Sequence, residues 1–368
     1  MIRAGAALSL TGGFSVQGLQ ARRGLELWTD DLNAAGGLGP GERVELLIAD
    51  DESRSEAAAR LTEKLIVEDR VDLLFSPYSS VLARAAAAVA ERHGRLLWNH
   101  GGSSDAIARG GCRFLINVAS PASRYFVGLL ALARSIEPSA RRLALLHGAR
   151  GTFPAEVVGG AEAEAGRIGY EVVLKASYPP TEDGLASLVV NVADLQPDVI
   201  LGVGRTEIDL ALARQLKAQR VRAALIGLVA APIQLFKETL GPDADGFIGP
   251  SQWEAGVRYH PDVGPTPTEF AARFRRRFGA EPDYPAAQAY AAGLIAQHCA
   301  QLAGSLRPEA LRDTAAGLDL TTFYGRFKLD ASGEQVGHEL VIVQWQGGAK
   351  PIIWPPAVAA RPPILTNR

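Results

Sequence analysis

The sequence predicts an α/β protein built from two doubly wound, Rossmann-like lobes. Three observations lead to this expectation. The chain has 368 residues, which is more than a single hydrophobic core usually serves. Short segments that are apolar on both faces alternate with helical segments, as in a parallel sheet that is covered by helices on both sides. This alternation runs from Ile2 to Trp98 and begins again after Pro121.

The first series of elements occupies the N-terminal part of the chain. The apolar segment Ile2–Leu10 predicts a strand, the pair Gly12-Gly13 predicts a turn, and the following segment predicts a helix that stops at Gly36-Gly37. The series continues with strand Val44–Ala49, helix Glu56–Glu68, strand Leu73–Phe75, helix Ala83–Arg92 and strand Leu96–Trp98. Strands that are connected through helices in this way pair in parallel, so these elements predict one parallel sheet.

The second series repeats the pattern. It comprises helix Tyr125–Ser135, strand Arg142–His147, helix Ala155–Ile168, strand Glu171–Ala176, helix Leu185–Leu195, strand Val199–Gly202, helix Glu207–Ala218, strand Ala224–Gly227 and helix Ile233–Leu240. Helices Glu269–Arg277 and Ala286–Ala303 follow, and then strands Phe323–Leu329 and Leu340–Gln346. The tail Pro355–Arg368 carries four prolines, so we expect it to wrap along the surface or fray instead of forming a helix.

The composition argues against several classes of partner. The formal net charge is −2, from 38 basic and 40 acidic residues, so neither nucleic acid nor an anionic membrane is expected to bind. The basic cluster Arg273–Arg277 lies in a helical pattern and is interpreted as a solvated helix face. No run of about 20 apolar residues is present, so direct membrane insertion is not expected. Cys112 and Cys299 form no C-x-x-C motif, which argues against a zinc site and leaves a disulfide between them open.

Catalytic signatures are also absent from the sequence. It contains no dinucleotide-binding glycine motif, no phosphate-binding Walker loop, no nucleophile elbow and no H-E-x-x-H motif. The six histidines are scattered without the spacing of metal ligands, and the acidic pair Asp50-Asp51 is explained by helix capping. His100 and His147 lie near strand ends, where each is better explained as a pocket or core residue than as a base. We therefore expect no enzyme activity, no metal and no cofactor.

The expected site lies where the strands end. Ligands of open parallel sheets bind beyond the carboxyl ends of the strands, where helix N-termini offer unpaired N–H groups and a partial positive charge. Small and hydroxyl residues follow the predicted strands at Thr11-Gly12-Gly13, Ser76 to Ser80, Asn99 to Asp105, Gly151 to Pro154 and Gly202 to Thr206. Turns and helix caps explain any one of these junctions. Aromatic residues at the same edge (Phe14, Tyr78, Trp98, Phe153) favour a small-molecule pocket, although each is also explained as core.

Several segments in a fixed order resemble the type I periplasmic-binding-protein superfamily, in particular its leucine/isoleucine/valine-binding and amide-binding branch. They are Leu10-Thr11-Gly12, Asp31 to Gly37, Asp50 to Ser53, Ser76 to Ser80, Tyr284 with Ala286 to Tyr290, and Phe323 to Phe327. Each match is weak alone, but together they cover nearly the whole chain. The resemblance implies two lobes that are joined by three crossovers, with a ligand cleft between them. Lobe one is expected at 1–120 plus 250–325, lobe two at 121–249 plus 326–345, and a C-terminal tail at 346–368.

The resemblance also implies particular ligand-binding residues. The hydroxyl and backbone that hold a ligand carboxylate match Ser80, with Tyr78 and Ser79 beside it. Contacts from the next loop match His100, Gly101, Gly102 and Ser103, with a register uncertain by one residue. A tyrosine of the first loop is replaced by Gln17, with Phe14 nearby, and an aromatic lid from lobe two matches Phe153.

One departure from the family pattern concerns the ligand's amine. The acid that holds an α-ammonium group in amino-acid binders falls on Val229 or its neighbours, where no carboxylate is present, although Glu207 or Asp209 could substitute. A buried ammonium without a counter-charge costs several kcal/mol, so the amino-acid ligand is in doubt. A second lobe-two aromatic is replaced by Gly204-Arg205. Arg205 either favours a further anionic group on the ligand or points to solvent, so aromatic, fatty or hydroxy acids and dicarboxylates become candidates.

The functional expectation is a solute-binding receptor of an ABC importer that closes its lobes on a small carboxylate-bearing molecule and delivers it to a membrane permease and ATPase. Met1–Leu10 is read as a first strand and not as a signal peptide. A mature periplasmic or extracellular protein whose leader was removed fits this reading. A cytosolic sensor of the amide-responsive type is the alternative, and an enzyme on the same fold, with His100 or His147 as base, is the third.

Overall fold

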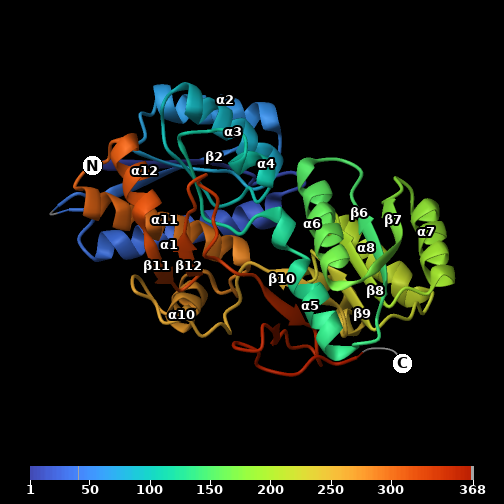
Figure 1. Ribbon diagram of the computed structural model, residues 1–368. Helices are drawn as coiled ribbons and strands as arrows, with labels where there is room; N and C mark the ends of the chain where they lie inside the picture. Colours follow the sequence, from blue (N-terminus) through green and yellow to red (C-terminus); the bar gives the residue numbers. More distant parts are fainter. Residues whose placement is uncertain (40, 366–368) are drawn as a thin grey trace. The chain divides into compact units, whose positions relative to one another are not determined.

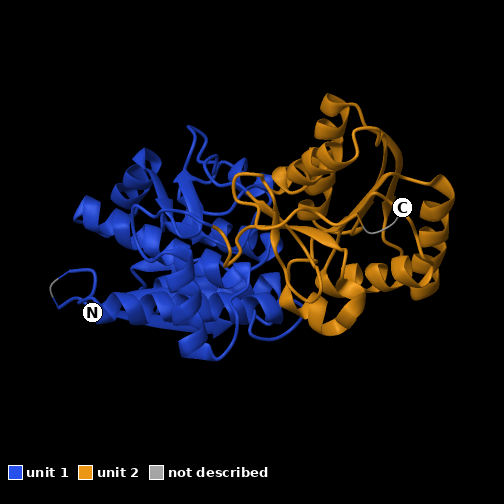
Figure 2. Cartoon of the chain, turned by 90° about the horizontal axis from the view of Figure 1, so that it is seen from below, with its two compact units in different colours: residues 1–121, 258–339 blue, residues 122–257, 340–368 orange. Residues whose placement is uncertain are grey.

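The computed structural model describes residues 1–39 and 41–365, which form two compact units (Figure 2). Unit 1 comprises residues 1–121 and 258–339, and unit 2 comprises residues 122–257 and 340–365. The chain therefore passes between the units three times. Compared with the expected lobe boundaries, residues 250–257 belong to unit 2, residues 121 and 326–339 belong to unit 1, and the tail from residue 346 is part of unit 2.

Unit 1 is built on a parallel sheet of five strands in the order β2-β1-β3-β4-β5. Its first segment contains β1 (Ile2–Leu8), α1 (Ser15–Ala34), β2 (Val44–Asp50), α2 (Ser55–Val67), β3 (Leu73–Phe75), α3 (Ser80–Arg92), β4 (Leu97–Asn99), α4 (Asp105–Ala108) and β5 (Leu115–Asn117). Its second segment adds α10 (Pro267–Phe278), α11 (Tyr284–Ala303), α12 (Pro308–Gly317), β11 (Asp319–Thr322) and β12 (Gly325–Lys328).

The two segments of unit 1 are joined mainly where α11 packs against α1 (Figure 1). Both helices carry glycine at the point of closest approach. A Cβ on Gly293 would come within 2.3 Å of the Trp28 ring, and one on Gly24 would come within 2.2 Å of the Ala286 carbonyl oxygen. Asp31 on α1 ties the pair together further, because it accepts hydrogen bonds from Tyr290 (2.8 Å) and Arg273 (3.0 Å).

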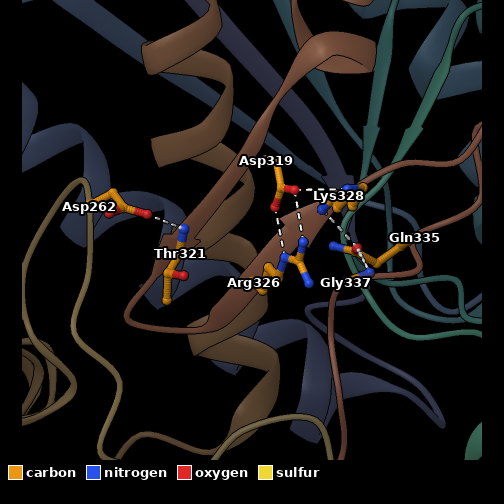
Figure 3. A network of polar contacts seen from close by, with 7 residues as sticks. All are labelled: Asp262, Asp319, Thr321, Arg326, Lys328, Gln335 and Gly337. Atoms are coloured by element: carbon orange, nitrogen blue, oxygen red, sulfur yellow. Dashed lines mark hydrogen bonds and ion pairs between the residues drawn. The ribbon is translucent and has the colours of Figure 1, made fainter.

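Beyond α12 the second segment forms the β11–β12 hairpin (Figure 3). The carboxylate of Asp319 binds Arg326 at 2.7 and 2.8 Å and Lys328 at 2.8 Å, and these basic groups hold the pKa of Asp319 well below its usual range. Asp262 accepts from the backbone N–H of Thr321 at 2.7 Å. All these charged groups are exposed, so they orient the hairpin without adding much to its stability.

A buried histidine marks the end of unit 1. His338 stacks on Tyr324 with ring centroids 4.2 Å apart, and its Nδ1 lies 2.7 Å from the Ser120 hydroxyl. The backbone at Gly325 has φ +140° and passes so close that a Cβ there would lie 2.9 Å from the His338 ring. Ser120 and His338 thus fix the two chain segments to each other just before each leaves unit 1.

Unit 2 is built on a sheet of seven strands in the order β14-β13-β10-β9-β8-β6-β7. Its elements are α5 (Val127–Ile136), β6 (Arg142–His147), α6 (Thr152–Ile168), β7 (Glu171–Ser177), α7 (Glu182–Leu195), β8 (Val199–Val203), α8 (Thr206–Ala218), β9 (Leu225–Leu228), α9 (Gln234–Leu240), β10 (Ile248–Ser251), β13 (Val341–Gln344) and β14 (Ile352–Trp354), with short 3₁₀ turns at Ala122–Arg124 and Gly241–Ala244. Strand β13 pairs antiparallel with both β10 and β14, and the other strand pairs are parallel.

Both faces of the unit 2 sheet are buried. Leu143 and Leu145 of β6 belong to one core cluster, whereas Ala144 and Leu146 belong to the cluster on the opposite face. This alternation explains why the strand is apolar throughout. The tail beyond β14 runs along unit 2, where the Gln344 side chain exchanges two hydrogen bonds of 2.7 Å with the backbone of Ile364. None of the helices in the described ranges combines the length and the apolar character that a membrane span requires.

Candidate functional site

Most of the site residues predicted in unit 1 lie in the loops at the carboxyl ends of β3 and β4. Two side chains, Ser76 and Asn99, fix the loop after β4. The Ser76 hydroxyl accepts from the backbone N–H groups of His100 and Gly101 at 3.1 and 3.2 Å, and Asn99 bonds both the N–H and the carbonyl of Gly102. These contacts are buried, so the loop is held in one conformation before any ligand arrives.

Glycine is required at two positions in that loop. A Cβ on Gly101 would lie 2.2 Å from the Pro77 carbonyl oxygen, and one on Gly102 would lie 2.6 Å from the Ala83 Cβ. The loops after β3 and β4 therefore pack backbone against backbone. This close packing brings Ser104 to the first turn of α3, where its N–H donates to the Ser80 hydroxyl at 3.1 Å.

The N-terminus of α3 has the features of an anion site. Ser79 is the N-cap residue, yet its side chain makes no capping hydrogen bond, and the first turn carries no acidic residue. The Ser79 hydroxyl oxygen is buried and has no hydrogen-bond partner in the described residues. The first N–H groups of a helix have no partner within the helix and carry partial positive charge. A carboxylate placed there would satisfy them together with the Ser79 hydroxyl.

Aromatic side chains border this end of the sheet. The rings of Phe14 and Tyr78 meet edge to face, 6.3 Å apart, and the hydroxyls of Tyr78 and Tyr284 lie 2.7 Å apart. Gln17 is buried in the first turn of α1. The sequence singled out all of these residues except Tyr284. Tyr284 is the first residue of α11, and the sequence indicated it only through the family resemblance.

His100 is fully buried, and neither ring nitrogen has a hydrogen-bond partner in the described residues. Burial lowers the pKa of His100 to about 4, so the ring is neutral near pH 7. A neutral, enclosed imidazole matches the expectation of a pocket or core residue. His147, in contrast, lies in unit 2, where its Nδ1 is 2.9 Å from the Gly148 carbonyl oxygen.

In unit 2 the corresponding residues lie at the carboxyl ends of β6, β8 and β9. Phe153, in the first turn of α6, meets Tyr125 edge to face at 5.1 Å, and Gln252 donates to the Tyr125 hydroxyl at 3.0 Å. Arg205 is exposed at the N-cap of α8. Val229 follows β9 and is half-buried against the core. No acidic residue occupies positions 228–231, where Leu228, Val229, Ala230 and Ala231 stand.

Asp209 is the acidic residue of interest at this edge of unit 2, and it is fully buried. Its carboxylate accepts from the Tyr178 hydroxyl at 3.0 Å, from the Ala230 N–H at 3.1 Å and from the Gly204 N–H. Burial raises the pKa of Asp209 to about 7, against the lowering effect of these donors. Glu207, the other acid considered from the sequence, is exposed.

The predicted site residues thus fall into two sets, one in each unit. Unit 1 brings together Phe14, Gln17, Tyr78, Ser79, Ser80, His100, Gly101, Gly102 and Ser103 at one end of its sheet. Unit 2 places Phe153, Arg205 and Val229 at the carboxyl ends of three of its strands. Tyr125, Tyr178 and Tyr284, which contact Phe153, Asp209 and Tyr78, were not among the predicted site residues. Within the described residues, no group of three or more His, Cys, Asp or Glu side chains could hold a metal ion.

Each unit is an α/β unit whose parallel strands end in loops of small and hydroxyl residues. The family model described as periplasmic binding protein matches residues 1–350. The chain belongs to this family. It is 24% identical over 370 residues to the Leu/Ile/Val-binding protein homolog 8 of Brucella abortus, covering 96% of this chain and 90% of that protein. Homolog 7 of the same organism is 23% identical, covering 97% and 92%.

Solved structures share the fold at lower identity. LivJ of Streptococcus pneumoniae, a branched-chain amino acid transporter substrate-binding protein in complex with isoleucine, matches with a TM-score of 0.81 at 19% identity, covering 95% of this chain and 97% of that chain. A solute-binding protein of R. palustris in complex with benzoate matches with a TM-score of 0.79 at 21% identity, covering 99% and 98%. These matches confirm the fold class. The relatives are solute-binding proteins, which confirms the expectation that the chain is not an enzyme.

Proposed function

We propose that this protein is an extracytoplasmic receptor of an ABC importer and that it binds a small acid without an amine group. A periplasmic or extracellular location and delivery to a permease with its ATPase follow from the family and are part of the proposal. The alternative is a cytosolic sensor of the same fold, which no contact in the structure favours. Loops of both units hold the solute, and binding shifts the protein toward a closed form.

The observation that carries the proposal is the N-terminus of α3. An uncapped helix start, a buried Ser79 hydroxyl without a partner and the nearby Ser80 hydroxyl together suit one carboxylate. The N–H groups of His100, Gly101 and Gly102 are already bonded to Ser76 and Asn99, so this preformed loop contributes its fixed backbone shape and the Ser103 side chain. Phe14 and Tyr78 supply an apolar border, as small-molecule sites usually have.

The absence of an amine is supported by the acids of unit 2. Positions 228–231 are apolar, Asp209 is occupied by three internal donors, and Glu207 is exposed. Of the two acids at these loops, Asp209 already has three donors and Glu207 points to solvent, so neither suits a buried α-ammonium group. One structural relative is solved with benzoate and another, from Rhodopseudomonas palustris BisB5, with 3,4-dihydroxybenzoic acid. Aromatic monoacids are therefore the first class to test.

The experiment is a thermal-shift screen on protein freed of bound solute by unfolding and refolding. Its compounds are benzoate, 3,4-dihydroxybenzoate, a fatty acid, a dicarboxylate, leucine and isoleucine. A ligand at 100 times its Kd stabilises the folded state by about 2.7 kcal/mol, which is readily measured. We expect amine-free acids to raise the melting temperature and the two amino acids to leave it unchanged. A shift with leucine or isoleucine alone would contradict the proposed ligand class.

A further inference from the structure

Asp209 has an arrangement that solute binding by direct contact does not explain. It lies in α8 and is fully buried. Its carboxylate accepts hydrogen bonds from the Tyr178 hydroxyl and from the N–H groups of Gly204 and Ala230. These three donors belong to the segments that follow β7, β8 and β9. No basic side chain pairs with Asp209 among the ion pairs of residues 1–39 and 41–365.

The segment after β8 is pressed against this carboxylate. A Cβ on Gly204 would lie 2.5 Å from the Tyr178 ring and 2.9 Å from an Asp209 carboxylate oxygen. Only glycine therefore fits where the chain passes over the pair. This close packing fixes the backbone immediately before Arg205, which is one of the site residues predicted from the sequence.

The segment after β9 is held at three consecutive residues by three different side chains. Asp209 accepts from the Ala230 N–H at 3.1 Å, the Trp345 indole donates to the Ala231 carbonyl at 2.8 Å, and the Lys350 ammonium donates to the Pro232 carbonyl. Lys350 is itself paired with Glu254 at 3.1 Å, and both side chains are largely buried. These contacts fix the backbone of residues 230–232 from three directions.

We infer that Asp209 is a positioning residue, which sets the loops after β7, β8 and β9 for solute binding without touching the solute. The effect on solute binding rests on the proposed function, whereas the ordering of these loops by Asp209 does not. With three donors on its two oxygens, the carboxylate has little capacity left for an ammonium group. The same contacts thus argue against Asp209 as a replacement for the acid that amino-acid binders have at the position of Val229.

The test compares three variants by hydrogen-exchange mass spectrometry and by calorimetry with benzoate as the probe. Asp209→Asn keeps an acceptor and the shape of the side chain, whereas Asp209→Leu keeps only the bulk. We expect Asp209→Leu to weaken benzoate binding by about 10-fold and Asp209→Asn by no more than about 3-fold. Exchange should quicken in Asp209→Leu at residues 203–206 and 229–232. Asp194→Leu, on the exposed end of α7, is the control and should change neither measurement.

Two results would overturn the inference: unchanged exchange in both loops of Asp209→Leu, or an equal loss of benzoate affinity in Asp209→Asn and Asp209→Leu. If the unaltered protein binds none of the probe acids, the proposed ligand class fails, and the exchange measurement alone decides the positioning role. If Asp209→Leu does not melt cooperatively, Tyr178→Phe replaces it, because it removes one of the three donors and keeps the ring. Unchanged exchange in that variant would count equally against the inference.

Discussion

At the scale of single residues, the serine pair at the start of α3 carries the proposed recognition. Ser79 has a buried hydroxyl without a partner, and the Ser80 hydroxyl accepts from Ser104. As an acceptor from one N–H, the Ser80 hydroxyl can still donate its own hydrogen to a carboxylate oxygen. Among the described residues, a hydrogen bond thus orients the Ser80 hydroxyl, whereas none orients the adjacent Ser79 hydroxyl.

Ser80→Ala should weaken binding of the acid found in the screen by about 1–3 kcal/mol, because a charged acceptor loses a donor. Calorimetry measures the change, and a thermal melt without ligand checks that the variant folds. Ser187→Ala is the control, because this exposed serine in α7 of unit 2 bonds only the Asp183 carbonyl. Unaltered affinity in Ser80→Ala would remove Ser80 from the site.

Asp209 should also give the stability of the protein a distinct pH dependence. Its pKa is about 7 when folded and near its ordinary value of 3.8 when unfolded, so the folded state holds the proton more tightly. The stability that this group contributes is present below pH 3.8 and is lost as the pH rises through 7. Urea unfolding should therefore show a larger stability difference between the unaltered protein and Asp209→Asn at pH 5 than at pH 8. A difference that is constant or grows with pH would contradict the raised pKa.

At the scale of elements, the close packing of α1 on α11 decides whether unit 1 can be completed. The contact depends on the missing side chains of Gly24 and Gly293, and on the ring of Trp28 that lies over Gly293. Neither glycine has an unusual φ angle, so the reason for glycine is space alone.

Gly293→Ala should destabilise the protein by about 1–3 kcal/mol, because the added Cβ would have to displace the Trp28 ring or separate the helices. Gly159→Ala is the matched control, since this helical glycine of α6 has no atom within 4 Å of the new Cβ. That change should instead stabilise by about 0.5–1 kcal/mol through the better helix propensity of alanine. Denaturant unfolding of both variants measures the contrast, and equal effects would refute the packing argument.

The alternating strands and helices could be predicted from the sequence because the inner strands, such as β6 and β8, are apolar on both faces. The strands Arg142–His147 and Val199–Gly202 were placed to within a residue. Short elements escaped prediction, among them β5 (Leu115–Asn117), β10 (Ile248–Ser251) and β11 (Asp319–Thr322). Three or four residues carry too little periodicity on their own, and these strands lie outside the regular strand–helix alternation that revealed the equally short β3.

The site residues of unit 1 were predictable because they follow strands directly. Residues that contact these side chains from distant parts of the sequence could not be predicted in this way. Tyr284 begins a helix about 200 residues away from Tyr78, and only the fold brings their hydroxyls together. The role of Asp209 was equally hidden, since its partners Tyr178, Gly204 and Ala230 share no local pattern with it. For the same reason, the boundaries at 257 and 339 could not be derived from composition.

At the scale of the whole molecule, each unit has its own sheet and its own hydrophobic core. We expect the solute-free protein to unfold in more than one step, because two cores connected by three chain segments need not melt together. Hydrogen-exchange mass spectrometry in increasing urea, with peptides assigned to each unit, measures the two steps. A bound acid that contacts both units should bring the steps closer together, whereas a ligand confined to unit 1 would raise the midpoint of that unit only.

The pairing of α1 with α11 also has a consequence for synthesis. Helix α1 ends at Ala34, but its partner begins at Tyr284, so a ribosome must translate almost all of unit 2 before unit 1 can close its core. Until then α1 can pack only on the first segment of unit 1, as Trp28 does on Phe75, and the side that α11 covers stays exposed. A nascent chain of this kind is a natural client for a chaperone that keeps it unfolded, which is also the state in which a polypeptide can be threaded across a membrane.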